Sequence, residues 1–325
     1  MGSLLTDVAA PREEEILAQL EDRIGRVHLR QRLGMEQDQE RLFGRGARPF
    51  DLEDVGFARS LLRTALKITG LHWLGNRNTE RIQVRHNRLG FAKFPSSFDG
   101  FTILHISDFH ADMNARAMQR LADILPALDY DVCVLTGDFR GETYGPFDEA
   151  LDEMARLRPY LKDPVYAVLG NHDSIRMVPA FEDMGIRMLL NESVALTRGS
   201  HRIHLAGIDD AHLYRLGSIE KAVAAIPHGE FSILLSHTPE VYRQASHAGF
   251  AFFLAGHTHG GQICLPGSIA IMLDSKLPRR LGAGPWRHNQ MAGYTSVGVG
   301  SCILPVRLNC PPEITLHHLK HASSR

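Results

Sequence analysis

The sequence lacks several features that mark common protein classes. It has only four cysteines among 325 residues, and no two of them form a Cys-x-x-Cys pair. We therefore predict reduced thiols, a reducing compartment and a cytoplasmic protein. The net charge is only −1, which gives no strong field for general nucleic-acid binding. No run of about 18 apolar residues occurs, so the sequence predicts no membrane-spanning helix.

The sequence does have enough apolar content for a large core. Hydrophobic residues make up 44% of the chain, and its length suggests about two domains. Residues 12–42 and 51–74 carry apolar side chains at roughly helical spacing. Gly75 is predicted to end the second helix. We therefore expect a helical N-terminal extension over residues 1–78 and a separate domain over residues 79–325.

Candidate strands alternate with candidate helices from about residue 81 onward. The predicted helices span residues 114–128 and 147–157. This alternation argues for an α/β fold with a parallel core. The strands expected in the core are residues 101–106, 131–136, 164–169, 231–235 and 250–255.

Each of these five strands is followed by side chains that commonly bind metals. Asp108 and His110 alternate across one residue, so in an extended chain they point to the same side. Ligands bind beyond the carboxyl ends of strands in open α/β sheets, so we expect the polar residues to meet there. The other histidines, among them His28 and His212, match no motif and are expected at the surface or in packing. The strand-end residues are Asp108 and His110, Asp138, Asn171 and His172, His237, and His257 and His259.

The donors divide into two sets that share one carboxylate. Asp138 can belong to both sets because its carboxylate has two oxygens. Mixed nitrogen and oxygen donors suit manganese, iron, zinc or cobalt better than calcium. Two such ions about 3.5–4 Å apart form the usual clamp for phosphoryl chemistry. One ion would be held by Asp108, His110, Asp138 and His259, and the other by Asp138, Asn171, His237 and His257.

The order of these motifs resembles that of a known family. Asp-x-His, Gly-Asp, Gly-Asn-His-Asp, a single His and Gly-His-x-His follow one another, as in the calcineurin-like metallophosphoesterases. The resemblance covers about residues 100–320. The Gly-Gly-Gln run after His259 is similar to a bacterial branch of small phosphodiesterases described as YkuE-like or YaeI-like. The resemblance implies a four-layer α/β/β/α sandwich, the dimetal ligand set above, and a role for His172 at the leaving-group oxygen.

The sequence departs from the protein phosphatases of that family at two points. The second Asp of their Gly-Asp-x-x-Asp-Arg-Gly motif is missing after Asp138. The residue that would orient His172 is therefore open between Glu142 and Asp173. Asp173-Ser174 stands where protein phosphatases have Glu-Arg-Gly, so a Ser/Thr phosphatase is not expected. The alternative role for His172 is structural, holding its own loop.

We therefore expect a metal-dependent hydrolase of phosphodiester or pyrophosphate bonds, in which a metal-bridging hydroxide attacks phosphorus. The expected cofactors are two divalent ions, manganese first, with iron, zinc or cobalt as alternatives. The expected substrate is a nucleotide-sugar or a lipid-linked diphosphate such as UDP-diacylglucosamine. Two other functions stay open: a cyclic-nucleotide phosphodiesterase, which also carries Gly-Asn-His-Asp, and a non-catalytic metal-binding scaffold such as the retromer subunit of this fold. No stable nucleic-acid partner is expected.

The helical extension runs into a strongly basic stretch. Residues 59–93 contain eight Lys or Arg side chains and one acidic residue, Glu80. Within residues 59–74, leucines gather on one side of the predicted helix and basic residues on another, and Trp73 extends the apolar end. Such a helix can lie in a membrane interface. We expect either peripheral contact with the inner face of the membrane or packing of the leucines on the catalytic domain.

Overall fold

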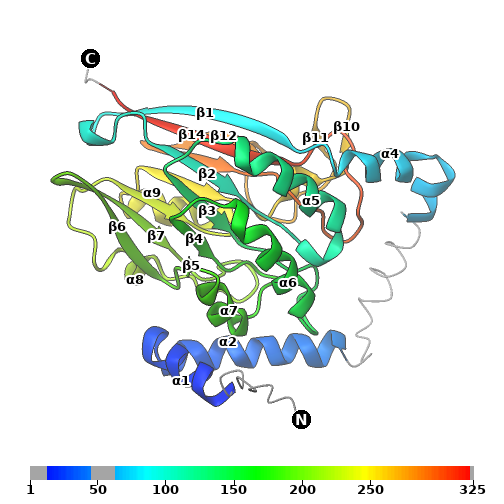
Figure 1. The fold of residues 1–325 in the computed structure, drawn as a ribbon, viewed down its shortest axis with the longest axis horizontal. Helices are drawn as coiled ribbons and strands as arrows, with labels where there is room; N and C mark the ends of the chain where they lie inside the picture. Colours follow the sequence, from blue (N-terminus) through cyan, green and yellow to red (C-terminus); the bar gives the residue numbers. More distant parts are fainter. Residues whose placement is uncertain (1–12, 45–62, 323–325) are drawn as a thin grey trace, which may run out of the picture.

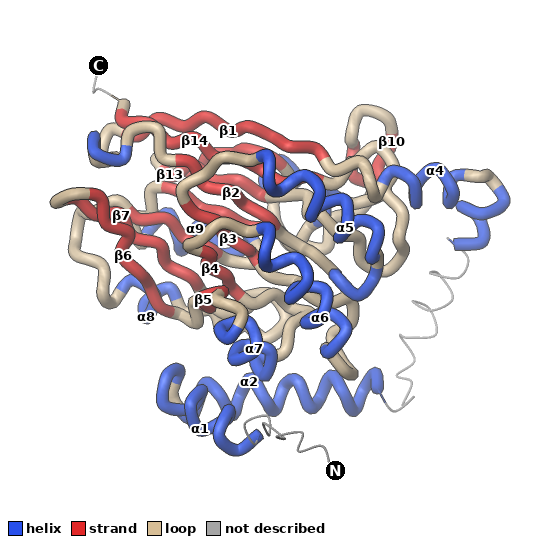
Figure 2. The backbone as a smooth tube through the Cα atoms, viewed as in Figure 1, coloured by secondary structure: helices blue, strands red, loops and turns tan. Residues whose placement is uncertain are grey.

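The computed structural model describes residues 13–44 and 63–322. Two six-stranded mixed sheets lie face to face, and helices cover their outer faces (Figure 1). Figure 2 shows the same layers, with the strands in red inside and most helices in blue outside. This is the four-layer α/β/β/α sandwich that the resemblance implied.

The first sheet contains three of the five strands that end in polar side chains. Strand β14 runs antiparallel to β2, while β2, β3, β4 and β5 are parallel neighbours. Parallel neighbours end at the same edge of the sheet. The strand order is β1 (Gln83–Phe91), β14 (Glu313–His321), β2 (Thr102–Ile106), β3 (Val132–Thr136), β4 (Val165–Val168) and β5 (Ile186–Met188).

The second sheet contains the other two such strands. Strands β7, β8, β9 and β13 are parallel, and the edge strands β6 and β12 are antiparallel to their neighbours. The order is β12 (Gly284–His288), β13 (Met291–Thr295), β9 (Phe252–Ala255), β8 (Ser232–Leu235), β7 (His201–Gly207) and β6 (Glu192–Arg198).

Alternation along the strands explains why they are apolar throughout. On β3, Val132 and Val134 pack between the two sheets, whereas Cys133 and Leu135 pack against the helices. Successive side chains of a strand point to opposite faces, and both faces are buried here. Leu121 of the helical layer is fully buried, and its truncation to Ala is expected to cost about 2–5 kcal/mol of stability.

Helices cover both outer faces. Helix α5 starts at a cap, because the Asn114 side chain accepts a hydrogen bond from the N–H of Ala117. The helices are α5 (Ala115–Ile124), α6 (Asp148–Leu157) and α7 (Val178–Asp183) on the first sheet, and α8 (Ile219–Val223) and α9 (Tyr242–His247) on the second. Short 3₁₀ turns are η2 (Ser96–Phe98), η3 (Ala111–Met113), η4 (Leu125–Ala127), η5 (Arg158–Tyr160), η6 (Ile175–Met177), η7 (Pro239–Val241), η8 (His259–Gly261) and η9 (Arg279–Leu281).

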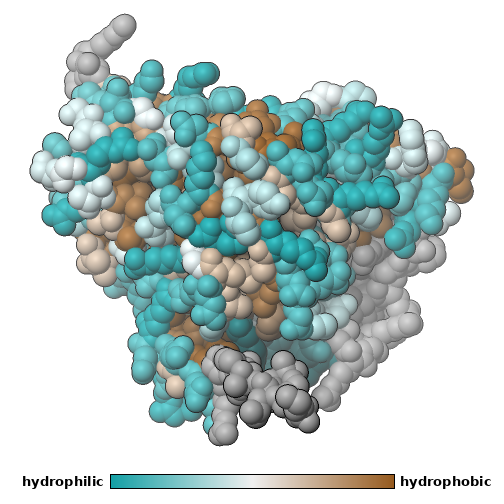
Figure 3. Space-filling view, viewed as in Figure 1, coloured by the Kyte–Doolittle hydropathy of each residue, from teal (hydrophilic) through white to brown (hydrophobic). Residues whose placement is uncertain are grey.

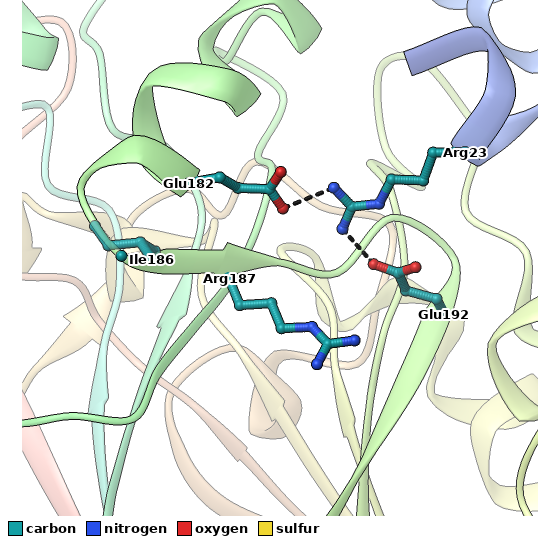
Figure 4. Close-up of a pocket in the computed structure, with 6 residues that line it drawn as sticks. Arg23, Glu182, Ile186, Arg187 and Glu192 are labelled. Atoms are coloured by element: carbon teal, nitrogen blue, oxygen red, sulfur yellow. Dashed lines mark hydrogen bonds and ion pairs between the residues drawn. The ribbon is translucent and has the colours of Figure 1, made fainter. Parts of the chain in front are cut away.

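The first part of the N-terminal extension packs on the two-sheet domain. It forms α1 (Glu13–Ile24) and α2 (Arg26–Gln39), followed by the π-helical turn η1 (Glu40–Gly44). Its apolar residues join the core between the first sheet and its helices. Arg23 pairs with Glu182 of α7 and with Glu192 of β6, at a recess of about 400 Å³ (Figure 4). None of the predicted metal ligands lines that recess.

The second predicted helix is divided, and its predicted end was wrong. Residues 63–68 are helical, a turn follows at Gly70 with φ 72°, and α4 spans Leu71–Asn78. Gly75 lies inside α4. Close packing of the helix on Val306 explains the glycine, because a Cβ added at Gly75 would lie 2.9 Å from the Val306 side chain. Residues 59–62, which belong to the predicted amphipathic stretch, lie outside the described residues. No helix in the described ranges is long and apolar enough to cross a membrane.

One small hairpin follows the last motif. Strands β10 (Cys264–Leu265) and β11 (Ile269–Ala270) pair antiparallel directly after η8. Figure 1 shows this hairpin beside the end of the molecule from which α4 projects. The hairpin was not predicted, since each of its strands has only two residues.

Candidate metal centre

The strand-end residues adopt an unusual backbone conformation. Five of the predicted ligands have positive φ, between 41° and 72°. This left-handed region is costly for residues other than glycine and is enriched at functional sites. The turns direct the side chains back over the ends of the strands. The five residues are Asp108, His110, Asp138, His257 and His259.

The structure brings the first predicted ligand set together. Ligand-type atoms of Asp108, His110, Asp138 and His259 lie within 4.8 Å of one another, and all four residues are buried. The Nε2 atoms of His110 and His259 are 3.0 Å apart. His259 Nε2 lies 3.4 Å from Asp108 Oδ1.

The second set lies beside it and shares the Asp138 carboxylate, whose Oδ2 also lies 3.8 Å from His110 Nε2 of the first set. Asp138, His237 and His257 form a buried group with the same spacing. His237 Nε2 lies 3.2 Å from Asp138 Oδ2 and 3.2 Å from His257 Nδ1. Asn171 Oδ1 lies 2.9 Å from His237 Nε2. All seven predicted ligands therefore converge on one place, with Asp138 between the two groups.

The surroundings fit divalent cations. Imidazole nitrogens face each other, and the ion pairs of Asp108 and Asp138 within the described ranges are all to histidines. Burial, together with the neighbouring Asp138 carboxylate, raises the pKa of Asp108 to about 6. Such a concentration of buried lone pairs and negative charge is costly unless cations compensate for it. The buried clusters are consistent with a dinuclear metal site.

Two histidines are held in the tautomer that a metal ligand needs. The Nδ1–H of His110 donates to the carbonyl of Arg140 at 2.8 Å, and the Nδ1–H of His237 donates to the carbonyl of Thr136 at 2.7 Å. A carbonyl can only accept, so the neutral form of each ring keeps its proton on Nδ1 and leaves the Nε2 lone pair for an ion. Burial lowers the pKa of His110 to about 3, which keeps that ring neutral.

His237 and Asp138 form a strongly coupled pair in the absence of ions. Burial would lower the pKa of His237, but the Asp138 carboxylate raises it to about 10. Burial would raise the pKa of Asp138, yet His237 and His172 hold it well below its usual range. An ion that binds here must therefore displace a proton from this pair.

A buried arginine behind His259 was not predicted. Arg307 is fully buried and donates to the carbonyls of Val297 and Gly300, both at 2.7 Å. Its Nη2 lies 3.3 Å from His259 Nδ1. Burial, with His110 and Arg307 nearby, keeps the pKa of His259 well below its usual value. No motif marks Arg307, because its partners are backbone carbonyls that only the fold brings near.

His172 lies at the open side of the centre. Its backbone N–H donates to Asp138 Oδ1 at 2.9 Å, and its carbonyl accepts from Arg140. Its ring stands edge-on to that of His110, with centroids 5.0 Å apart. The ring is 21% exposed, and within the described ranges its buried Nδ1 has no hydrogen-bond partner.

Neither candidate for orienting His172 does so. Asp173 is buried and accepts hydrogen bonds from the N–H groups of Asp138, Phe139 and Gly170. Glu142 is exposed. The loop of His172 is held through its backbone instead.

His212 also belongs to this region, although the sequence interpretation left it out. Its ring lies 4.2 Å from that of His257, centroid to centroid, and its Nδ1 lies 3.0 Å from Glu240. The hydrogen bond to Glu240 raises the pKa of His212. The sequence did contain a signal for His212, because this residue follows the end of β7 just as the predicted ligands follow other strands.

Comparison with known proteins agrees with the geometry. Residues 101–261 match the family described as calcineurin-like phosphoesterase. YkoQ of Bacillus subtilis, an uncharacterized metallophosphoesterase, is 27% identical over 254 residues, which cover 75% of this chain and 93% of YkoQ. YkuE of B. subtilis is 28% identical over 74% of this chain and 86% of YkuE. The phosphodiesterase YaeI of Escherichia coli is 26% identical over 73% of this chain and 87% of YaeI. The fold, the buried Asp/His clusters and the match over residues 101–261 together show that the chain belongs to the calcineurin-like phosphoesterase family.

Proposed function

We propose that this protein hydrolyses phosphodiester or pyrophosphate bonds with the help of two divalent ions. The observation that carries the proposal is the position of Asp138, which belongs to both clusters of buried ligand-type side chains. A shared carboxylate allows two ions to bind one phosphate group together. Two such ions, when bound, would neutralise phosphate oxygens and lower the pKa of an attacking water. Manganese is the first candidate because the donors are mixed nitrogen and oxygen.

The protein groups divide into those that bind and one that transfers a proton. The seven predicted ligands are each 8% exposed or less, whereas the His172 ring is 21% exposed. His172 can therefore meet a substrate that approaches the centre from solvent. We assign it as the proton donor to the leaving-group oxygen. Its loop is fixed by backbone contacts to Asp138 and Arg140, so the ring is not needed to hold the loop.

The proposed substrate is a phosphodiester or a diphosphate. The phosphodiesterase name of the related YaeI supports this class. The complete ligand set with His172 argues against a scaffold that has lost catalysis. A lipid-linked diphosphate, such as UDP-diacylglucosamine at the cytoplasmic face of a membrane, is the specific candidate.

The projecting helical arm, residues 63–78, supports the lipid candidate. Leu66 packs on Leu304, Val306 and Leu308, but Ile68 and Trp73 are 81% and 68% exposed. Figure 3 shows hydrophobic residues at the projecting end of the molecule. The arm carries three basic side chains and no acidic one, which is complementary to an anionic lipid surface. One face of the arm therefore anchors it to the domain, while the other is free to meet lipid.

A substrate panel tests the reaction. Metal-depleted protein, with and without Mn²⁺, is assayed on bis(p-nitrophenyl) phosphate, cyclic AMP, UDP-N-acetylglucosamine and p-nitrophenyl phosphate. We expect Mn²⁺-dependent turnover of the diester or the sugar-nucleotide, exceeding that of the monoester. Turnover of cyclic AMP alone would support the cyclic-nucleotide alternative. Absence of Mn²⁺-dependent turnover on the panel, by protein that binds two ions, would support the scaffold alternative.

A further inference from the structure

We propose that helix α2 is a positioning element of the metal centre. In this proposal, Arg32 and Glu36 hold the loop that carries Asn171 and His172 in the geometry needed to bind the second ion. The inference rests on the dimetal function proposed above. It assigns a role to the N-terminal helix that no motif in the sequence indicated.

Glu36 binds the loop directly. One carboxylate oxygen accepts a hydrogen bond from the backbone N–H of Ile175 at 2.8 Å, and the other accepts from the Ser174 hydroxyl at 2.7 Å. Arg176 adds an ion pair at 3.4 Å. Glu36 is only 8% exposed, so these hydrogen bonds are protected from water. They fix the chain three to four residues after Asn171.

Arg32 binds the same loop from one helical turn earlier. Its Nη2 donates to the carbonyl of Asp173 at 2.7 Å, and its Nε donates to Glu36 at 3.1 Å. The guanidinium also lies 3.5 Å from Asp209 and over the ring of Tyr214. Arg32 is fully buried. Each contact fixes the guanidinium plane and therefore the direction of the bond to Asp173.

The loop held by α2 is linked to the shared ligand. The Asp173 side chain accepts from the N–H of Asp138, while the Asp173 carbonyl accepts from Arg32. A displacement of α2 would therefore be transmitted through one residue to both Asn171 and Asp138. His28 strengthens the attachment, since its Nε2 lies 2.8 Å from Asp209. The sequence interpretation had assigned His28 to surface or packing.

Stability alone does not explain these charged side chains. A buried ion pair commonly contributes no more to stability than apolar residues of similar size would. Apolar residues, however, could not donate to the Asp173 carbonyl or accept from Ile175. Groups that orient metal ligands from outside the coordination sphere typically change metal affinity about 10–100-fold when they are removed.

Mn²⁺ binding to the full chain tests the inference. Calorimetry gives the affinities of the first and second equivalents, and electron paramagnetic resonance detects the spin-coupled ion pair. The variants are Glu36→Ala, which removes the acceptors, and Glu36→Gln, which keeps an acceptor for Ile175. Arg32→Lys removes the planar donor but keeps the charge. Arg30→Ala and Gln37→Ala are matched controls, because both residues lie exposed on α2.

We expect Glu36→Ala to weaken binding of the second Mn²⁺ equivalent about 10–100-fold. The resonance signal of the spin-coupled ion pair should be lost in this variant. Glu36→Gln should stay within about threefold of the wild type, and Arg32→Lys should lie between them. Wild-type affinity for the second equivalent in Glu36→Ala would overturn the inference. If Glu36→Ala does not fold, Ser174→Ala removes a single hydrogen bond to the same carboxylate, and an unchanged second affinity there would overturn it. A wild-type protein that binds fewer than two ions would instead refute the dimetal function itself.

Discussion

The carboxylate of Asp173 accepts a hydrogen bond from the backbone N–H of Asp138 at 2.9 Å. The same carboxylate accepts from Phe139 at 2.8 Å and from Gly170 at 2.7 Å. It therefore joins the loops that follow β3 and β4. These are the loops that carry Asp138 and Asn171, so Asp173 sets the distance between two predicted ligands of the second ion.

Asp173→Asn is expected to lower both stability and metal affinity. The amide presents one acceptor oxygen where the carboxylate has two, so at least one of three buried N–H groups loses its partner. An orphaned buried donor costs about 1–3 kcal/mol of unfolding free energy. Urea unfolding in EDTA measures the first effect and Mn²⁺ calorimetry the second. Unchanged stability and unchanged Mn²⁺ affinity would show that this link does not matter.

His172→Ala is expected to keep both ions and lose rate. A single proton-transfer residue is typically worth about 10²–10⁴-fold in rate. The loss should be larger for an alkyl phosphodiester than for a p-nitrophenyl diester, because the alkoxide leaves poorly without a proton. His228→Ala, a change at an exposed histidine, is the control. Normal turnover of the alkyl diester would contradict the acid role, and loss of metal would show that the residue is structural.

The buried His105 is expected to make the fold less stable in acid. Burial lowers its pKa from 6.5 to about 3, so between these values the unfolded chain binds a proton that the folded chain does not. The free energy of unfolding should therefore decrease as the pH is lowered through this window, and this residue should contribute about 1.4 kcal/mol per pH unit to the decrease. His105→Gln should show a shallower dependence than the wild type in urea unfolding with EDTA. The same slope in both proteins would contradict this, and the exposed His228→Gln should leave the slope unchanged.

The exposed face of the helical arm is expected to bind anionic lipid. Ile68→Glu/Trp73→Glu changes two exposed side chains, so it should weaken flotation with phosphatidylglycerol vesicles at low salt without lowering the melting temperature. High salt should weaken wild-type flotation too, since basic residues near an anionic surface each contribute about 1 kcal/mol. Tyr160→Glu, at an exposed aromatic residue on η5, is the control. A wild-type protein that ignores these vesicles would remove the main support for a lipid-linked substrate.

The sequence predicted that the seven proposed ligands would lie close together, because the signal for their position is local. Each follows an apolar strand within a few residues, and parallel strands bring their ends together without further information. The predicted end of the second helix was wrong because Gly75 does not terminate the helix. A Cβ at this position would lie too close to Val306, which is far away in the chain. Arg32 was missed for the same reason. Its partner Asp173 is 141 residues away, and nothing in the local pattern of α2 distinguishes it from an exposed helix arginine.

The most direct test of the dimetal centre is the number of Mn²⁺ ions bound by purified wild-type protein and by Asp138→Ala, measured by calorimetry. Asp129→Ala, at an exposed aspartate, is the matched control. Because Asp138 belongs to both clusters, we expect about two equivalents in the wild type and the control, and loss of both in Asp138→Ala. Two equivalents in Asp138→Ala, or none in the wild type, would contradict the account.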